Sequence, residues 1–119
     1  MDIIRMNSGD DQVYSLFCEY AESELVYRRL DREEFERRFF EAEEGYEKVF
    51  LCAKNGDSAA GFAAGCIKLS GDVSYVTALL TAREYRNMGL GTALLSSLEA
   101  AMRTPETKKY EFSFYNPQS

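Results

Sequence analysis

Three strand-length apolar runs follow one another between residues 49 and 81. Val49–Ala53 is compact and apolar, and Asn55-Gly56 behind it predicts a hairpin because both residues tolerate positive φ. The returning run, Ala59–Leu69, is rich in alanine and glycine, which indicates that something approaches its backbone closely. After a second turn, Val73–Thr81 is dense in β-branched and aromatic residues. The segment therefore predicts a sheet of consecutive strands.

Helical patterns precede this sheet. The short apolar opening Ile3–Met6 predicts a strand. Ser8-Gly9-Asp10-Asp11 is typical of a capping box, and apolar residues recur behind it at helical spacing up to Ala21. Asp31-Arg32-Glu33-Glu34 begins a second helix in the same manner, with Gly45 as its predicted end.

A third helix and a last strand follow the sheet. Apolar residues from Leu90 to Met102 lie on one helical face, and Thr104-Pro105 ends that helix. Tyr110–Tyr115 alternates like a strand. The predicted order is β-α-α-β-β-β-α-β, which describes one α+β domain over residues 1–119.

The chain carries 14 basic and 20 acidic residues, a net charge of −6. This balance argues against a nucleic-acid partner, which requires a basic face, and against docking on anionic lipid. An acidic surface could gather cationic amines, or it could only keep the protein soluble. With no signal peptide and no membrane-spanning stretch, we expect a cytoplasmic protein.

The cysteine and histidine content excludes several kinds of site. Three cysteines without a CxxC spacing suggest neither a disulfide framework nor a zinc site. The chain has no histidine, so a Ser/His or Cys/His catalytic pair is excluded. We predict no metal site.

The segment with the most chemical content is Tyr85–Leu95, where a polar loop with two glycines opens a helix. The free N–H groups of a helix's first turn and the helix dipole form an anion site. Gly89 and Gly91 have no Cβ, so a phosphate can approach the backbone. A dinucleotide fingerprint fits poorly because Leu94 occupies its third small position, and the Gly-Lys-Ser/Thr of a triphosphate loop is absent. The bland alternative is that the glycines only begin a helix.

The same segment resembles the signature of the GNAT superfamily of acetyl-CoA-dependent N-acetyltransferases, R/Q-x-x-G-x-G/A. Arg86, Gly89 and Gly91 match its fixed positions. The strands and turns from Val49 onward resemble the family's sheet in the same order. The resemblance implies a GNAT-like mixed, mainly antiparallel sheet flanked by helices.

The resemblance also implies how acetyl-CoA binds as cosubstrate, in a gap where the fourth and fifth strands splay apart. Arg86 would add countercharge, and the pantetheine arm would pair with the fourth strand. The backbone groups that would bind the pyrophosphate are those of Asn87, Met88, Gly89, Leu90, Gly91 and Thr92. Those that would bind the arm are those of Leu79, Leu80 and Thr81.

The implied reaction is direct transfer of an acetyl group to a primary amine of a small molecule or peptide. The amine must lose a proton, so a general base assists. The residues leave several candidates open. They are the carboxylates Glu19, Glu22 and Glu24, or a water chain near Tyr75 and Thr77.

Family domains continue past the fifth strand into a helix with a catalytic tyrosine and two more strands, which this chain is expected to lack. Tyr115 precedes that helix and cannot be given the tyrosine's role. Tyr110–Tyr115 would then have an uncovered edge, which predicts a homodimer through that strand. The alternatives are a non-catalytic acyl-CoA-binding module or half-domain, and a degenerate fragment that binds nothing.

Overall fold

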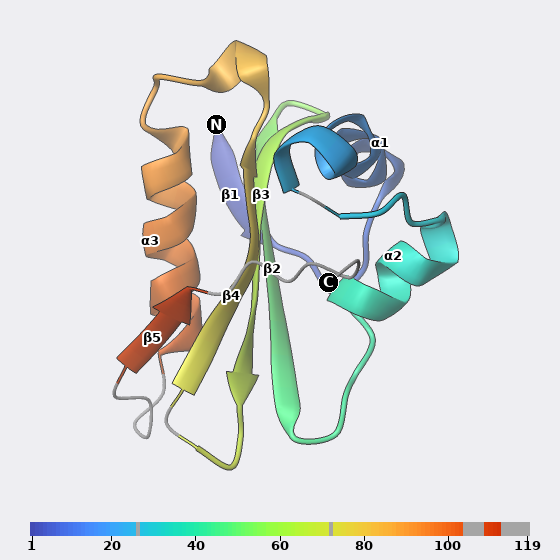
Figure 1. Ribbon diagram of the computed structural model, residues 1–119. Helices are drawn as coiled ribbons and strands as arrows, with labels where there is room; N and C mark the ends of the chain where they lie inside the picture. The colour runs from blue at the N-terminus through green and yellow to red at the C-terminus, as the bar shows by residue number, and fades with distance from the viewer. Residues whose placement is uncertain (26, 72, 104–108, 113–119) are drawn as a thin grey trace.

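A computed structural model describes residues 1–25, 27–71, 73–103 and 109–112. Figure 1 shows a single sheet with α3 on one face and α1 and α2 on the other. The elements are β1 Asp2–Arg5, α1 Asp11–Tyr20, a π-helical turn Ala21–Leu25, α2 Arg32–Phe39, β2 Tyr46–Asn55, β3 Ser58–Lys68, β4 Val73–Thr81, a 3-10 turn Arg83–Tyr85, α3 Leu90–Met102 and β5 Lys109–Phe112.

The strands lie in the order β1-β2-β3-β4-β5. The first three pairs are antiparallel, and β4 pairs with β5 in parallel. A parallel pair requires a crossover connection, and α3 supplies it. The predicted α+β class, the order of elements and the mainly antiparallel sheet are therefore confirmed.

The β2–β3 hairpin forms where the sequence predicts it, one residue later than the Asn55-Gly56 pattern suggests. Asn55 pairs with Ser58, so Gly56 and Asp57 form the loop. Gly56 has a φ of 64° and is the residue that requires the left-handed region.

The small residues of β3 are required because other parts of the protein lie very close to this strand. A Cβ on Gly61 would lie 2.6 Å from the Leu80 carbonyl oxygen, and one on Gly65 would lie 2.5 Å from the sulfur of Met102. The prediction of a close approach to this strand is confirmed. The groups that approach it are β4 and α3.

Two apolar cores lie on the two faces of the sheet. On the α1 and α2 face, Phe35 is fully buried, and its ring centroid lies 5.1 Å from that of Phe17 and 5.3 Å from that of Phe39. On the other face, Leu94, Leu98 and Met102 of α3 are fully buried against the sheet. The sheet is thereby fixed between layers on both sides. No helix among the described residues is long and apolar enough to cross a bilayer.

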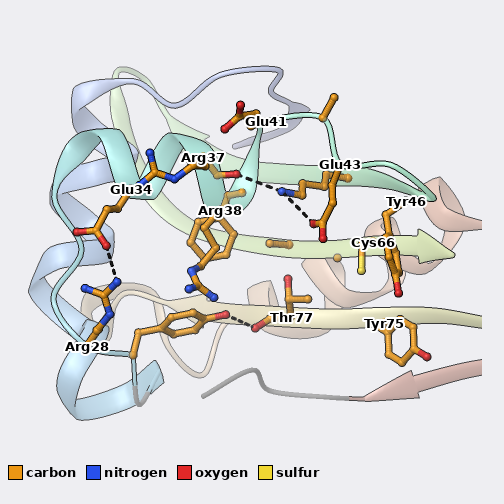
Figure 2. Close-up of a pocket in the computed structure, with 16 residues that line it drawn as sticks. Arg28, Glu34, Arg37, Arg38, Glu41, Glu43, Tyr46, Cys66, Tyr75 and Thr77 are labelled. Carbon is orange, nitrogen blue, oxygen red and sulfur yellow. Dashed lines mark hydrogen bonds and ion pairs between the residues drawn. The ribbon is translucent and has the colours of Figure 1, made fainter. Parts of the chain in front are cut away.

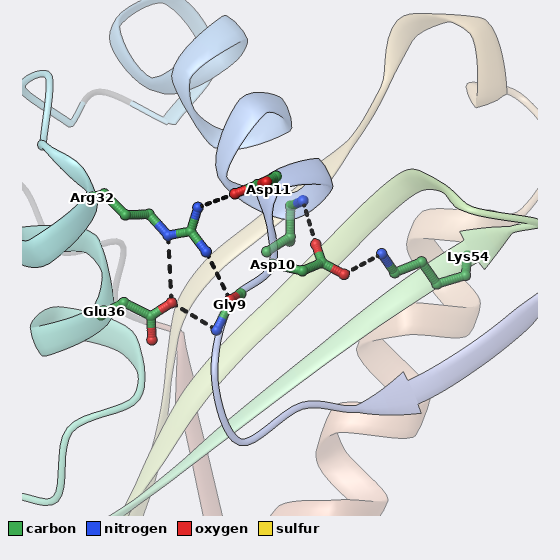
Figure 3. Close-up of polar contacts among 7 residues, drawn as sticks. Gly9, Asp10, Asp11, Arg32, Glu36 and Lys54 are labelled. Carbon is green, nitrogen blue, oxygen red and sulfur yellow. Dashed lines mark hydrogen bonds and ion pairs between the residues drawn. The ribbon is translucent and has the colours of Figure 1, made fainter.

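The first helix begins at a different cap from the predicted capping box. Its N-cap is Asp10, whose carboxylate accepts from the N–H of Val13 at 2.9 Å. Gly9 is held against α2, where its N–H donates to Glu36 at 2.8 Å (Figure 3). A Cβ added to Gly9 would lie 2.7 Å from the Phe35 ring. This contact places the chain's entry into the helix after Gly9. The second predicted cap is confirmed, since Asp31 accepts from the N–H of Glu34.

The second helix ends at Phe39, so the predicted end near Gly45 is wrong. Phe40 leaves the helical region with a φ of −126°. Its ring centroid lies 4.6 Å from that of Phe50 on the sheet. Packing of that ring on the sheet therefore ends the helix six residues before the glycine that the pattern indicated.

Replacing Asp10 with alanine is expected to lower the free energy of unfolding at pH 7 by about 1 kcal/mol, the usual value of an N-cap. Burial raises the pKa of Asp10, but hydrogen bonds from Lys54 and from the Val13 N–H outweigh it, so the pKa lies below 3.8. Its stabilisation is therefore present above the unfolded pKa and is lost as the pH falls through the lowered folded value. Urea unfolding of the wild type and the variant between pH 7 and 2 tests this. A difference that grows with acidity would contradict it.

Candidate functional site

The second half of β4 has an edge without a partner strand in the described part of the chain. β5 pairs only with Val73–Val76. Beyond that point the Thr77 carbonyl accepts from the Tyr27 hydroxyl at 2.8 Å, and the Thr81 carbonyl accepts from Arg86 Nε at 3.0 Å. Backbone groups two residues apart on a strand point the same way. Leu79, between these two, therefore turns its N–H and C=O to this open edge, Thr77–Thr81.

A β-bulge marks the start of the open edge. The register with β3 passes from Val76 directly to Ala78, so Thr77 has no partner there. The extra residue changes which face the side chains meet. Val76 packs against α3, whereas Ala78 belongs to the core on the α1 and α2 face. Bulges re-aim backbone groups in this way next to many functional sites.

The 87–92 loop lies at the other end of the open edge. Asn87 and Gly89 have φ values of 64° and 78°. Left-handed residues in such a run form a concave nest of N–H groups that binds anions. Ala93 is the first residue whose N–H enters the helical ladder, donating to the Gly89 carbonyl at 3.0 Å. None of the six N–H groups from Asn87 to Thr92 makes a hydrogen bond of ordinary geometry within the described residues.

The two glycines of the loop differ in backbone conformation and in what surrounds them. Gly89 is the N-cap of α3 in the left-handed conformation, with open space where a Cβ would stand. Gly91 has an ordinary φ, and an added Cβ would meet only the Thr81 hydroxyl at 3.4 Å. The fold itself therefore has room for a Cβ at Gly91. The same contact brings the end of β4 beside the first turn of α3.

The other predicted residues of this region lie as follows. Met88 is 66% exposed at the loop's tip, and Thr92 is exposed on the first turn of α3. Leu90 packs against the core beneath α3. The Leu80 carbonyl faces β3, beside Gly61, and the Leu80 side chain is buried.

Arg86 is folded back on the protein. In addition to its bond to Thr81, its Nη2 lies 3.4 Å from a Glu24 carboxylate oxygen. Arg83 lies 3.7 Å from the same oxygen, and both guanidinium groups lie over the Tyr20 ring. Glu24 comes from the π-helical turn after α1, which the sequence did not predict. This cluster fixes the chain at its exit from β4.

A cavity of about 700 Å³ lies on the α2 side of β4, beside the bulge. Thr77 and Tyr75 line it on the sheet side, and Figure 2 shows α2 residues opposite them. Within the described part of the chain, seven charged side chains line it, namely Arg28, Arg37, Arg38, Lys48, Glu34, Glu41 and Glu43. The open edge, the loop and the cavity thus meet at one strand.

Two ionisable groups of the cavity, Glu34 and Cys66, have pKa values shifted by their surroundings. A hydrogen bond from Arg28 lowers the pKa of the Glu34 carboxyl, which therefore stays charged. Burial raises the pKa of the Cys66 thiol, and the nearby Glu43 carboxylate raises it further. Cys66 is therefore a neutral thiol at pH 7 and not a thiolate nucleophile.

The candidate bases separate into two groups. Tyr75 and Thr77 line the cavity. Glu19 and Glu22 are exposed, Glu24 is paired with the two arginines, and none of these three lines it. Tyr115 lies outside the described residues.

The cavity walls could not be identified from sequence patterns. Tyr27, Arg38, Glu43 and Cys66 come from four different segments, with no common spacing or motif. The one sequence feature related to the cavity is the high density of charged residues between positions 33 and 47. A solvent-exposed helix face explains that density equally well.

The acetyltransferase (GNAT) family model matches residues 11–117. The chain belongs to the GNAT family of acetyltransferases. The predicted family membership and fold are thus confirmed, and the match includes the open edge and the 87–92 loop. No curated protein matches the sequence.

Several solved structures have the same fold at low sequence identity. A tandem GNAT protein of the clavulanic acid biosynthesis pathway is 18% identical over 93% of this chain, with a TM-score of 0.72. An aminoglycoside acetyltransferase from an uncultured soil metagenomic sample, in complex with sisomicin, is 11% identical over 96%, with a TM-score of 0.68. N-acetylglutamate synthase of Neisseria gonorrhoeae, with coenzyme A and N-acetyl-glutamate, is 14% identical over 94%, with a TM-score of 0.69.

This chain matches different shares of the length of these proteins. This chain spans 35% of the tandem protein, 77% of the aminoglycoside enzyme and 25% of the synthase. At these identities the likeness concerns the fold alone.

Proposed function

We propose that this domain transfers an acetyl group from acetyl-CoA directly to a primary amine of a small molecule or peptide. The observation behind the proposal is a set of six N–H groups, from Asn87 to Thr92, that have no hydrogen-bond partner among the described residues and lie beside an open strand edge. Exposed N–H groups at a helix N-terminus bind phosphate, and an open edge binds an extended amide-containing chain. Coenzyme A offers both groups in one molecule.

The pyrophosphate binds at the 87–92 loop in this proposal, and the pantetheine arm runs along the open edge. The Leu79 N–H and C=O and the Thr81 N–H are the backbone groups available to the arm, because the Thr81 carbonyl is occupied by Arg86. Leu80 contributes through its buried side chain, which fixes the strand. Arg86 adds countercharge and keeps the edge in place.

The thioester then lies near the bulge, next to the cavity on the α2 side of β4. The amine attacks the thioester carbonyl, a C–N bond forms, and the C–S bond breaks as thiolate leaves. The Leu79 N–H is the free backbone donor next after the bulge, and it stabilises the developing oxyanion. The amine proton passes to water held near Tyr75 and Thr77. Holding both reactants in one place supplies much of the rate.

A thiol-release assay with acetyl-CoA and a panel of amines tests the activity, and calorimetry with coenzyme A tests binding separately. We expect both to be positive. Binding without release on any amine would favour the non-catalytic acyl-CoA-binding module. Absence of heat and of a thermal shift would reject both readings in favour of a chain that binds nothing.

Self-association through β5 is part of the proposal, since β5 is an edge strand of the described sheet. Sedimentation velocity at rising protein concentration is expected to show a dimer. A strict monomer at high concentration would refute this part and leave the activity proposal intact.

A further inference from the structure

The cavity has the opposite charge balance to the chain as a whole. The sequence contains 20 acidic and 14 basic residues, yet among the described residues four basic and three acidic side chains line the cavity. A cavity that selected only a cationic amine would need an excess of carboxylates. The observed excess of basic groups favours a ligand with an anionic group.

Two of the three carboxylates are already paired. Glu34 binds Arg28, which lowers its pKa. Glu43 lies 3.6 Å from Lys48 Nζ. Figure 2 shows Glu34 turned toward Arg28, and Glu43 on the segment that follows α2. Glu34 and Glu43 therefore hold basic side chains in position. They do not form an open acidic site for a cationic ligand.

Lys48 is more enclosed than Arg28 and Arg37, whose side chains are 46% and 57% exposed. Its side chain is only 16% exposed. Its ammonium group donates to the Arg37 carbonyl at 3.1 Å, while Glu43 lies beyond hydrogen-bond distance. An ammonium has three donors, so Lys48 keeps donor capacity for a further acceptor.

Arg38 brings a second positive charge close to the bulge. Its guanidinium carbon lies 5.9 Å from the centroid of the Tyr27 ring, and the hydroxyl of that ring donates to the Thr77 carbonyl. Figure 2 shows the Arg38 side chain reaching from α2 toward the strand of Thr77. A planar guanidinium suits a carboxylate, to which it can donate two parallel hydrogen bonds.

We infer that the acceptor is a primary amine that also carries a carboxylate, which Lys48 and Arg38 bind while the amine faces the bulge. The inference rests on the proposed function and specifies its substrate class. The carboxylate could belong to a free amino acid or to the C-terminus of a short peptide. Phe39, Tyr46 and Tyr75 line the cavity as well and provide apolar surface for an attached side chain.

The test compares acids with their amides. The probes are phenylalanine, phenylalaninamide, glycylphenylalanine and its amide, titrated into the protein saturated with coenzyme A and also assayed by thiol release. Each acid is expected to bind at least about tenfold more tightly than its amide, as the loss of one charged hydrogen bond predicts. An amino amide has the less basic amine, so reactivity alone would favour the amide. The stronger of the two acids distinguishes a free amino acid from a peptide.

Variants assign the effect to the two cations. Lys48→Met and Arg38→Met are each expected to weaken binding of the acid at least about tenfold and to leave the amide and coenzyme A unchanged. Lys68→Met, which removes an equal charge at an exposed end of β3, is the matched control. If one of the two variants fails to fold, the result for the other is sufficient for the test.

Equal affinity for acid and amide, including no measurable binding of either, would overturn the inference. Loss of thiol release with every amine, with tighter binding of the acid retained, would instead reject the proposed transfer and leave the carboxylate site standing. The binding and activity measurements therefore fail independently.

Discussion

Replacing Gly91 with leucine is expected to weaken coenzyme A binding by at least about 100-fold, the equivalent of losing one or two charged hydrogen bonds. The backbone itself accepts a side chain at its first atom, because a Cβ at Gly91 meets only the Thr81 hydroxyl at an ordinary 3.4 Å. The leucine side chain would stand over the N–H groups of the 87–92 loop. Calorimetric titration of coenzyme A measures the loss, and thermal unfolding verifies the fold.

Two further glycine variants serve as comparisons. Gly71→Leu places the same side chain in an exposed turn, where an added Cβ has its nearest contact at 3.9 Å, and it should leave affinity unchanged. Gly89→Ala adds little bulk but must adopt a φ of 78°, so it should destabilise the loop by about 1–2 kcal/mol. A folded Gly91→Leu protein with wild-type affinity would show that the phosphate binds elsewhere.

Replacing Phe35 with alanine is expected to lower the free energy of unfolding by about 3–5 kcal/mol, the usual range for a buried phenylalanine. Phe35 is 0% exposed, and the rings of Tyr14, Phe17 and Phe39 all lie within 5.4 Å of it. A domain of this size has about 5–15 kcal/mol in total, so the variant would be marginal. Urea unfolding at pH 7 measures the change.

The matched control for Phe35→Ala is Phe40→Ala on the same side of the sheet. Phe40 is only half-buried, so its removal should cost clearly less. Glu33→Ala, at a carboxylate with 88% exposure, should have almost no effect. Equal losses for Phe35 and Phe40 would contradict the description of Phe35 as the centre of this core.

Local sequence patterns were sufficient for elements whose ends are set locally. Val73–Thr81 and Leu90–Met102 form the strand and the helix that periodicity predicts. The Asp31 cap is likewise made within one turn of chain. The residues matched by the GNAT signature lie on a loop whose left-handed Gly89 is the conformation that the glycine pattern favours.

The features that the sequence did not predict correctly depend on contacts between distant parts of the chain. The first helix begins after Gly9 because α2 binds that backbone, 27 residues away in sequence. The second helix ends early because the Phe40 ring packs on the sheet. The cavity and its charge balance depend on how α2 lies over β3 and β4, which no short pattern contains.

The central claim is that the N–H groups of the 87–92 loop and the open edge bind coenzyme A. The direct measurement is a titration of isotope-labelled protein with coenzyme A, followed through backbone amide chemical shifts. The account predicts the largest changes at residues 87–92, together with Leu79 and Thr81. Saturation that leaves those amides unmoved while others shift would contradict it.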